Sequence, residues 1–208
     1  MILSILVYSL IFFYSFCFGI FVFQSKDFSF SFGFGHYNFI VGFLLYLIIR
    51  FFIKPLKENI NFFETFQHET THMFFAFITF KNIYSFKASS NSGGLIKTEK
   101  INPIVALSPY TIPLFSLFFI LLTFIVKEKY LGILFFFSGF FFAQFLSATV
   151  KDTLFVKQPD LERYPFISYI IILISLFFFI FFFYFFITYG NNLFYIIPKS
   201  TFYLLFSK

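Results

Sequence analysis

Residues 59–80 read NINFFETFQHETTHMFFAFITF, a stretch in which phenylalanines surround a short run of polar and titratable side chains. Two of the three histidines in the chain, His68 and His72, lie here, and Glu69 follows the first of them directly. Side chains four residues apart lie on the same face of an α-helix. The spacing therefore predicts a helix over 59–80 whose two imidazoles can reach one metal ion, with a carboxylate beside them.

Polar residues extend along this face of the predicted helix beyond the two histidines. They are Asn61, Glu64, Thr65, His68, Glu69 and His72. Ionisable groups in membrane segments are costly and face a protein interior or a water-filled cavity. We expect the polar face to line such a cavity and the phenylalanines to contact lipid or neighbouring helices. The alternative is a structural polar stripe whose histidines are satisfied by neighbouring hydrogen bonds.

The composition of the whole chain indicates its class. Hydrophobic residues make up 60% of the 208 residues and charged residues only 12%, with a mean hydropathy of +0.89. A soluble domain of this length needs much more polar surface to cover its core. The sequence therefore predicts an integral membrane protein in contact with the lipid bilayer. We interpret its phenylalanines as lipid-facing or packing residues and assign no function to them.

The charged residues and the single cysteine exclude several kinds of site. The net charge of +6 comes from lysines scattered among the loops rather than from a continuous run. This pattern favours anchoring at a membrane surface over nucleic-acid binding. Cys17 is the only cysteine, which excludes an intramolecular disulfide and a cysteine metal cluster. The oligomeric state is not indicated by the sequence.

Hydrophobic segments of the length needed to cross a bilayer, about 20 residues in a helix, divide the chain. We expect an all-α, polytopic transmembrane helix bundle of about six segments that forms a single membrane domain over 1–208. Its core covers about 59–189, and 1–57 supplies additional N-terminal helices. The predicted segments are 1–23, 38–53, 59–80, 103–126, 130–149 and 165–189. A last segment at 193–206, interrupted by Pro198, is too short to assign.

We assign no functional role to the N-terminal part of the chain. Residues 1–23 resemble a secretory signal peptide in length, but no basic residues precede the apolar run and no small-x-small cleavage site follows it. We therefore interpret them as a retained transmembrane helix. His36 lies in the linker 24–37 among serines and glycines, and we interpret it as a solvated loop residue rather than a metal ligand.

Residues 81–102 form the longest polar stretch and follow the histidine pair directly. They contain four lysines and the flexible run Ala88-Ser89-Ser90-Asn91-Ser92-Gly93-Gly94. One interpretation is an exposed linker. The other is a short hairpin or re-entrant loop beside the site, with an edge that pairs with an extended substrate. Serine and glycine are compatible with both.

A catalytic zinc ion takes three protein ligands and leaves the fourth position for water, so one more ligand must come from elsewhere. Our first choice is Asp160, which precedes the last clear span; Asp152 is the second, and Glu64 and Glu128 are weaker candidates. The alternative role for Asp160 is an N-terminal cap on the following helix. If every hydrophobic segment crosses the membrane, Asp160 and the start of the histidine helix lie on opposite faces, so either one segment is re-entrant or Asp160 is not the ligand.

Together these residues resemble the site-2-protease-like intramembrane zinc metalloproteases, the M50 group, and in particular its small bacterial M50B-like members. The resemblance covers roughly residues 60–175. It rests on His68-Glu69-x-x-His72, Ser92-Gly93-Gly94, Leu107-Ser108-Pro109-Tyr110 and Gln158-Pro159-Asp160-Leu161. The chain differs from better-studied members in that Leu161, not glycine, follows the aspartate, and in that no asparagine occurs over 103–126.

The resemblance implies a function and a location. It implies hydrolysis of peptide bonds in a membrane protein or peptide substrate, within or at a bacterial inner membrane. It also implies Zn²⁺ as the cofactor, His68, His72 and a later aspartate as ligands, and Glu69 as the catalytic base.

Two other functional classes stay open from the residues themselves. One is a non-catalytic membrane scaffold or chaperone with a structural metal site. The other is a metal transporter, which needs more intramembrane carboxylates or histidines along a path than this sequence contains.

Overall fold

The computed structural model describes residues 33–89, 94–98, 102–156, 158–162 and 165–189. The helices are α2 (Phe34–Phe52), α3 (Lys57–Ile78), α4 (Pro103–Thr111), α5 (Leu114–Leu122), α6 (Leu131–Leu154), α7 (Pro159–Glu162) and α8 (Pro165–Tyr189). Two strands, β1 (Ile83–Lys87) and β2 (Leu95–Thr98), complete the described elements together with short 3-10 turns at Lys54–Leu56 and Glu128–Tyr130. The predicted segments 1–23 and 193–206, and Cys17, lie outside the described residues.

Three helical stretches are long and apolar enough to cross a membrane, and they indicate an integral membrane protein. They are Phe34–Phe52, Glu128–Leu154 and Phe166–Tyr189. Helices α4 and α5 pass the same test as a pair but are bent by 71°. The bend falls at Ile112 and Pro113, because proline cannot continue a helix hydrogen-bond ladder.

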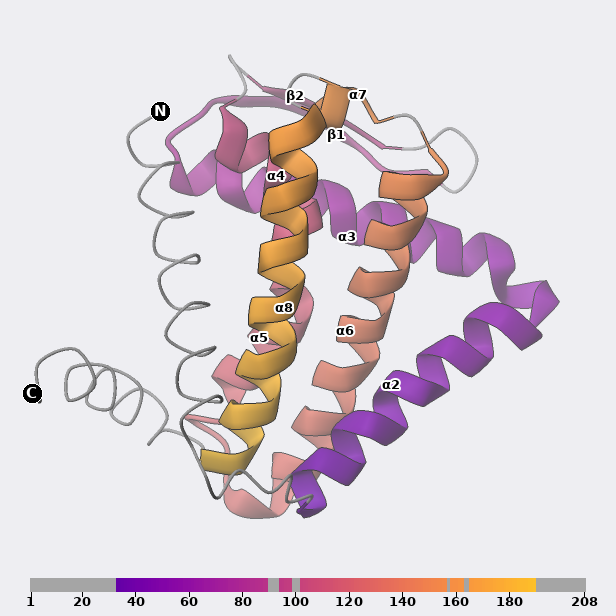
Figure 1. Ribbon diagram of the computed structural model, residues 1–208, viewed down its shortest axis with the longest axis vertical. Helices are drawn as coiled ribbons and strands as arrows, with labels where there is room; N and C mark the ends of the chain where they lie inside the picture. The colour runs from indigo at the N-terminus through magenta and orange to yellow at the C-terminus, as the bar shows by residue number, and fades with distance from the viewer. Residues whose placement is uncertain (1–32, 90–93, 99–101, 157, 163–164, 190–208) are drawn as a thin grey trace, which may run out of the picture.

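Helix α3 forms over the predicted segment 59–80 but is not among these candidate spans. Its polar face, together with Lys57 and Glu58 in its first turn, lowers the hydropathy of the helix. In Figure 1, α6 and α8 run along the long axis, whereas α3 lies across their upper ends. The helix that carries the two histidines therefore differs from the other predicted membrane segments in both composition and direction.

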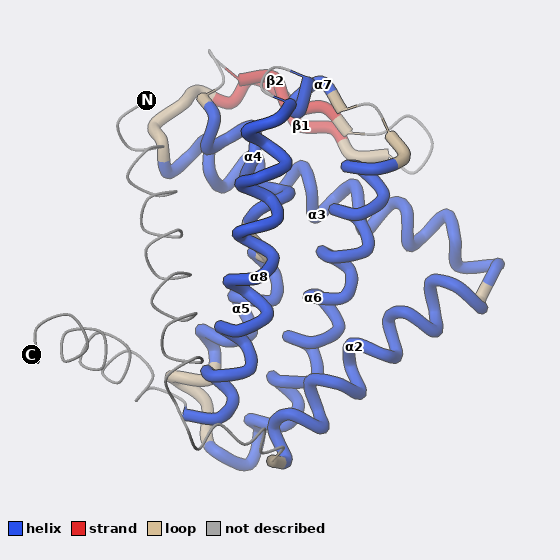
Figure 2. The backbone as a smooth tube through the Cα atoms, in the orientation of Figure 1, coloured by secondary structure: helices blue, strands red, loops and turns tan. Residues whose placement is uncertain are grey.

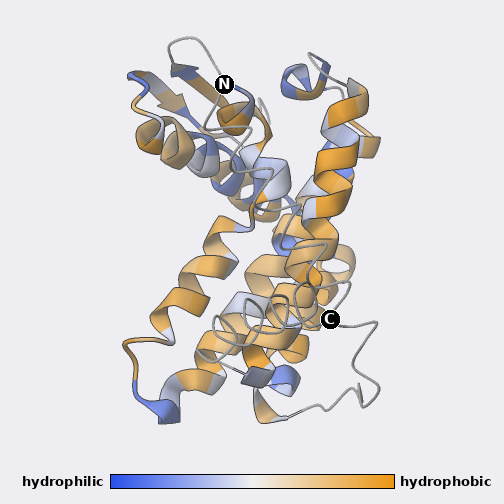
Figure 3. Ribbon diagram, turned by 60° about the vertical axis from the view of Figure 1, so that its left-hand side comes forward, coloured by the Kyte–Doolittle hydropathy of each residue, from blue (hydrophilic) through white to orange (hydrophobic). Residues whose placement is uncertain are grey.

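Close helix packing and buried aromatic rings hold the bundle together. Helices α2 and α6 approach so closely that a Cβ atom on Gly42 would overlap the backbone of Phe136, and one on Gly139 the backbone of Phe39. A phenylalanine-rich core joins α5, α6 and α8. Many other phenylalanines are exposed on the outer surface, and Figure 3 shows that hydrophobic residues dominate the long helices. The phenylalanines thus divide into packing residues and outward-facing residues, as the sequence analysis expected from the composition.

Residues 81–102 include an antiparallel hairpin, as the second interpretation predicted, and are not a plain linker, whereas the pairing of an edge with a substrate stays a prediction. Phe86 pairs with Ile96 and Lys87 with Leu95, and the register shifts between Ile83 and Ser85. Figure 2 shows the two strands at the same end of the bundle as α3, α4 and α7. The strands therefore lie beside the helix that carries the histidines.

The interpretation of His36 as a solvated loop residue is wrong. Helix α2 begins at Phe34, and His36 lies in its first turn with only 6% of its surface exposed. Its Nδ1 accepts a hydrogen bond from the Gly33 N–H at 3.1 Å, which leaves the hydrogen on Nε2. Nε2 lies 3.1 Å from the Thr188 hydroxyl and 3.3 Å from the Tyr184 carbonyl oxygen. His36 thus joins α2 to α8 and takes no part in the site described below.

Candidate metal centre

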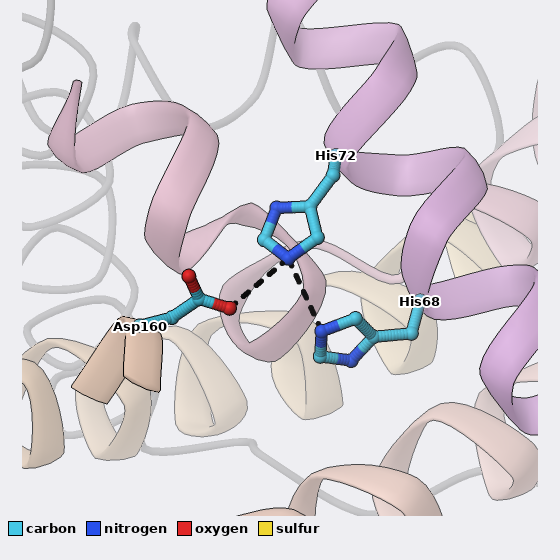
Figure 4. A group of neighbouring side chains, drawn as sticks. All are labelled: His68, His72 and Asp160. Atoms are coloured by element: carbon cyan, nitrogen blue, oxygen red, sulfur yellow. Dashed lines mark hydrogen bonds and ion pairs between the residues drawn. The ribbon is translucent and has the colours of Figure 1, made fainter. Parts of the chain in front are cut away.

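Helix α3 presents His68 and His72 one turn apart, and Asp160 of α7 meets them from a distant part of the chain (Figure 4). The two Nε2 atoms of the histidines are 3.2 Å apart. Oδ2 of Asp160 lies 3.2 Å from Nε2 of His72. Taken together, one ligand atom from each of the three residues lies within 4.8 Å of the other two. This is the group of residues on which the sequence prediction depended.

Two of these three distances fit a tetrahedral zinc ion. With Zn–N and Zn–O bonds of 2.0–2.2 Å, neighbouring ligand atoms of a tetrahedron are about 3.3 Å apart. Two of the three ligand pairs are at 3.2 Å. Two imidazoles with one carboxylate are also a donor set that catalytic zinc sites use. The alternative role of Asp160 as a cap on the last span does not match its position, because Asp160 lies inside α7 and α8 begins only at Pro165.

The backbone of α4 orients His72. Asn102 caps this helix by accepting a hydrogen bond from the Val105 N–H at 2.8 Å, and Pro103 occupies its first turn. The Val105 carbonyl oxygen lies 2.6 Å from Nδ1 of His72. A hydrogen on Nδ1 donated to this carbonyl fixes the ring and directs the lone pair of Nε2 toward His68 and Asp160.

Asp152 lies on the opposite side of His68 from the other two ligand candidates. Its Oδ2 is 3.6 Å from Nδ1 of His68, whereas Nε2 of His68 faces His72. A carboxylate beside the second ring nitrogen of a metal-bound histidine is a recurring arrangement that orients the ligand and increases its basicity. The geometry therefore assigns Asp152 to a supporting position, outside the group formed by His68, His72 and Asp160.

The two weaker candidates, Glu64 and Glu128, are not part of this group. Glu64 is 2% exposed and accepts hydrogen bonds from the Tyr46 hydroxyl and the Lys151 ammonium, each at 2.7 Å, and from Arg50. Its carboxylate is therefore already engaged. Glu128 lies at the other end of α6 from Asp152, roughly 36 Å away along the helix.

Glu69 is buried beside the ligand group and its protonation is set by its surroundings. Burial raises the pKa of its carboxyl to about 7, the nearby charge of His72 opposes this shift, and those of Asp160 and Asp152 add to it. A carboxyl with a pKa near 7 can accept and release a proton at neutral pH.

The two imidazoles differ in their affinity for a proton. Burial lowers the pKa of His68 well below its ordinary value, and the nearby charges of His72 and Lys151 lower it further. Burial also lowers the pKa of His72, but the hydrogen bond and the charge of Asp160 outweigh this effect and raise it overall. Asp160 therefore stabilises a proton on Nε2 of His72. A metal ion bound by these two residues would take the place of that proton.

Two cavities meet at Glu69. A cavity of about 270 Å³ is lined by the three ligand candidates and by Leu95 and Ile96 of β2. A larger one of about 610 Å³ extends from His68 toward the ends of α2 and α6. Glu69 lines both, and the volume of the larger one is that of an ordinary ligand pocket. The predicted polar face of α3 thus lines an accessible space, as the sequence indicated.

Gly94, directly before β2, lies so close to the side chain of Glu69 that a larger residue there would displace it. A Cβ atom on Gly94 would overlap Oε1, Cγ and Cδ of Glu69. Glu69 is therefore held between its own helix and the hairpin backbone.

The sequence interpretation assigned no role at the site to several residues that surround the group. These are Val105 with its carbonyl, Tyr110, whose ring packs edge-on to His68 at 5.0 Å between centroids, and the cluster of Tyr46, Arg50 and Lys151 around Glu64. Arg50 gave the clearest signal, because a charged residue in an apolar segment needs a partner on a neighbouring helix.

Comparisons with protein-family models, with curated proteins and with solved structures found no match to this chain. The interpretation of the site therefore rests on the geometry of the described residues and on the sequence pattern.

Proposed function

We propose that this chain is a membrane-embedded, zinc-dependent endopeptidase that hydrolyses peptide bonds of membrane proteins or membrane-associated peptides, in a bacterial cytoplasmic membrane. The observation that carries the proposal is the convergence of Asp160 on His68 and His72, with Glu69 next to them on the wall of two cavities. Two candidate ligands on α3 and one on α7 lie together, and two of the three pairs are at the separation of neighbouring ligands of a tetrahedral ion.

The three ligand candidates define what the site can hold. His68, His72 and Asp160 would bind Zn²⁺ and leave one coordination position free, as in catalytic zinc sites. Zinc at such a site polarises a substrate carbonyl and makes water a nucleophile near neutral pH. The carbonyl of Val105 and the carboxylate of Asp152 keep the two imidazoles in the orientation that binding requires.

Glu69 is the residue that handles protons in this proposal. It accepts the proton of the attacking water and then delivers it to the leaving amine, which requires a carboxyl that can exist in both forms at neutral pH. The pKa of about 7 meets this requirement. Its contact with Gly94 restricts the side chain, so the carboxylate does not have to be positioned during the reaction.

The hairpin supplies a surface for an extended substrate. Leu95 and Ile96 of β2 line the same cavity as the ligands, and in the described part of the chain β2 pairs with β1 alone. An extended peptide added along the other edge of β2 would bring successive peptide bonds past Glu69.

The proposal is tested by measuring zinc content and peptide cleavage on the same detergent-purified protein. We expect about one zinc per chain in the wild type and in Glu69→Gln, and loss of zinc in His68→Ala and Asp160→Asn. Cleavage of a mixture of transmembrane peptides should fall at least about 100-fold in Glu69→Gln. Glu58→Gln, on the exposed first turn of the same helix, is the matched control.

Each alternative has its own result. Zinc in the wild type together with undiminished cleavage in Glu69→Gln would contradict the proposed role of this residue. Stoichiometric zinc without any cleavage would indicate a scaffold with a structural metal site. Absence of zinc from wild-type protein purified without chelator would indicate that the polar residues of α3 serve only in packing.

A further inference from the structure

The larger cavity has a cationic wall, formed by Arg50, Lys57 and Lys151, and His68 and Glu69 line the same cavity. These residues come from the end of α2, the start of α3 and the end of α6. One carboxylate, that of Glu64, lies among them and contacts two of the three. The positive charge on this part of the cavity therefore exceeds the negative charge.

The hydrogen bonds of Glu64 show which donors of the neighbouring cations are still free to bind a ligand in the cavity. Glu64 is 2% exposed and accepts from Arg50, from Lys151 and from the Tyr46 hydroxyl. The side chains of Arg50 and Lys151 are 16% and 32% exposed. Since a guanidinium has five donors and an ammonium three, both keep donors that Glu64 does not use. The carboxylate of the cluster is buried and fully engaged, whereas its cations reach the cavity.

A purely structural role explains only part of this cluster. Glu64 with Arg50 and Lys151 joins three helices, and a single cation would already neutralise the buried carboxylate. The second cation and the exposed Lys57 are not needed for that purpose. The other acids that line the cavity, Glu69 and Asp152, lie beside His68. The cavity thus carries two acids beside His68 and, around Glu64 at the ends of α2 and α6, an excess of cations.

The distance between Glu64 and Glu69 along α3 indicates which residue of a substrate the cations would contact. Glu64 precedes Glu69 by five residues, which is roughly 7.5 Å along a helix. An extended peptide advances roughly 3.3 Å per residue. A peptide whose scissile bond lies at Glu69 would therefore reach Arg50 and Lys151 with a side chain roughly two to three residues away.

We propose that the wall of Arg50, Lys57 and Lys151 binds a carboxylate of the substrate, two to three residues from the bond that is cleaved. The carboxylate belongs either to an acidic side chain or to the C-terminus of the peptide, since both present the same group to an arginine and a lysine. This inference rests on the proposed peptidase function and adds to it the preference of the site for an acidic substrate.

The test compares peptide pairs that differ only in one charge, using the zinc-loaded wild-type protein in neutral detergent. Each pair carries aspartate or asparagine at one position, from one to six residues on either side of the cleaved bond, and a further pair has a free or an amidated C-terminus. We expect kcat/KM to be about tenfold higher for the acidic member at the second or third position. A preference confined to the free C-terminus would identify the terminal carboxylate as the bound group.

Variants then locate the interaction. Lys151→Gln leaves Glu64 its contacts with Arg50 and Tyr46, so the fold should be retained, and the preference should fall to about threefold or less. Lys127→Gln, an exposed lysine at the opposite end of α6, should retain the wild-type preference.

The two levels of the proposal fail differently. Equal rates for the acidic and amide peptides, with cleavage intact, would overturn the carboxylate site alone. An unchanged preference in Lys151→Gln would also overturn it. Absence of cleavage of every peptide by zinc-loaded protein would overturn the peptidase function and this inference with it.

Discussion

Replacing Gly94 with alanine should disable the site without removing its ligands. The new Cβ atom would overlap three atoms of Glu69, which are also its three nearest neighbours, so the strain falls on the proposed base and not on the histidines. The added Cβ would lie 2.1–2.4 Å from these atoms, which is shorter than an ordinary van der Waals contact by about 1 Å, and misplacing a reacting group by that distance costs on the order of 100-fold in rate. We therefore expect a folded protein with normal zinc content and about 1% of the wild-type kcat/KM.

The assay measures zinc content and kcat/KM for Gly94→Ala beside Gly33→Ala. Gly33 is the matched control, because the nearest atom to an added Cβ there is Nδ1 of His36, at 3.9 Å. The control should behave as wild type in both measurements. If Gly94→Ala keeps its rate to within about threefold, Glu69 is not held by the hairpin backbone and the reasoning is refuted.

Three further results are expected from the same structure. Asp152→Asn removes the charge beside one imidazole, so zinc affinity in a chelator competition should fall roughly 10- to 100-fold without being abolished. Glu64→Gln leaves two partly buried cations without a counter-charge, so the free energy of unfolding should fall by about 3 kcal/mol. In the same denaturation experiment Glu58→Gln should lose at most about 0.5 kcal/mol, because it is exposed. Gly42→Ala places a Cβ against the backbone of α6, so the melting temperature in detergent should fall, and an unchanged value would contradict the close packing of α2.

Hydropathy predicted most of the described bundle, because long apolar segments are the clearest signal a membrane chain carries. The segments at 38–53, 103–126, 130–149 and 165–189 correspond to α2, the α4 and α5 pair, α6 and α8. The hairpin could not be decided in advance, since serine and glycine serve linkers and turns equally well.

The candidate site divides into parts that the sequence carries and parts that only the fold brings together. The approach of His68 and His72 follows from helical spacing alone. The position of Asp160 depends on how α7 is placed relative to α3. The fold brings Asp160 to His72 and Asp152 to the other side of His68, and no local sequence pattern distinguishes the two aspartates. The Val105 carbonyl carries no side-chain signal at all. His36 was misjudged because serine and glycine before it suggested a loop, whereas α2 begins at Phe34.

The direction of α3 resolves the conflict between the predicted topology and the third ligand. If α3 crossed the membrane, three passes would separate its start from Asp160, and the two would lie on opposite faces. Since α3 lies across the upper ends of α6 and α8, the chain descends through α4 and α5 and returns through α6 to the same end (Figure 1). Asp160 and His72 then lie at the same end of the bundle, whether the bent pair of α4 and α5 is a broken span or a re-entrant loop.

The same arrangement determines where a substrate would be cut. Asp152 lies only two residues before the end of α6, so the ligand group sits near the end of a candidate span and not at its midpoint. The cavity of about 610 Å³ opens at this level and gives water a path to Glu69. A peptide bond that reaches Glu69 would thus lie near the membrane surface. Cleavage sites mapped by mass spectrometry should therefore fall at the end of a substrate's hydrophobic segment, and sites at its centre would show that α3 lies deeper than its polar face indicates.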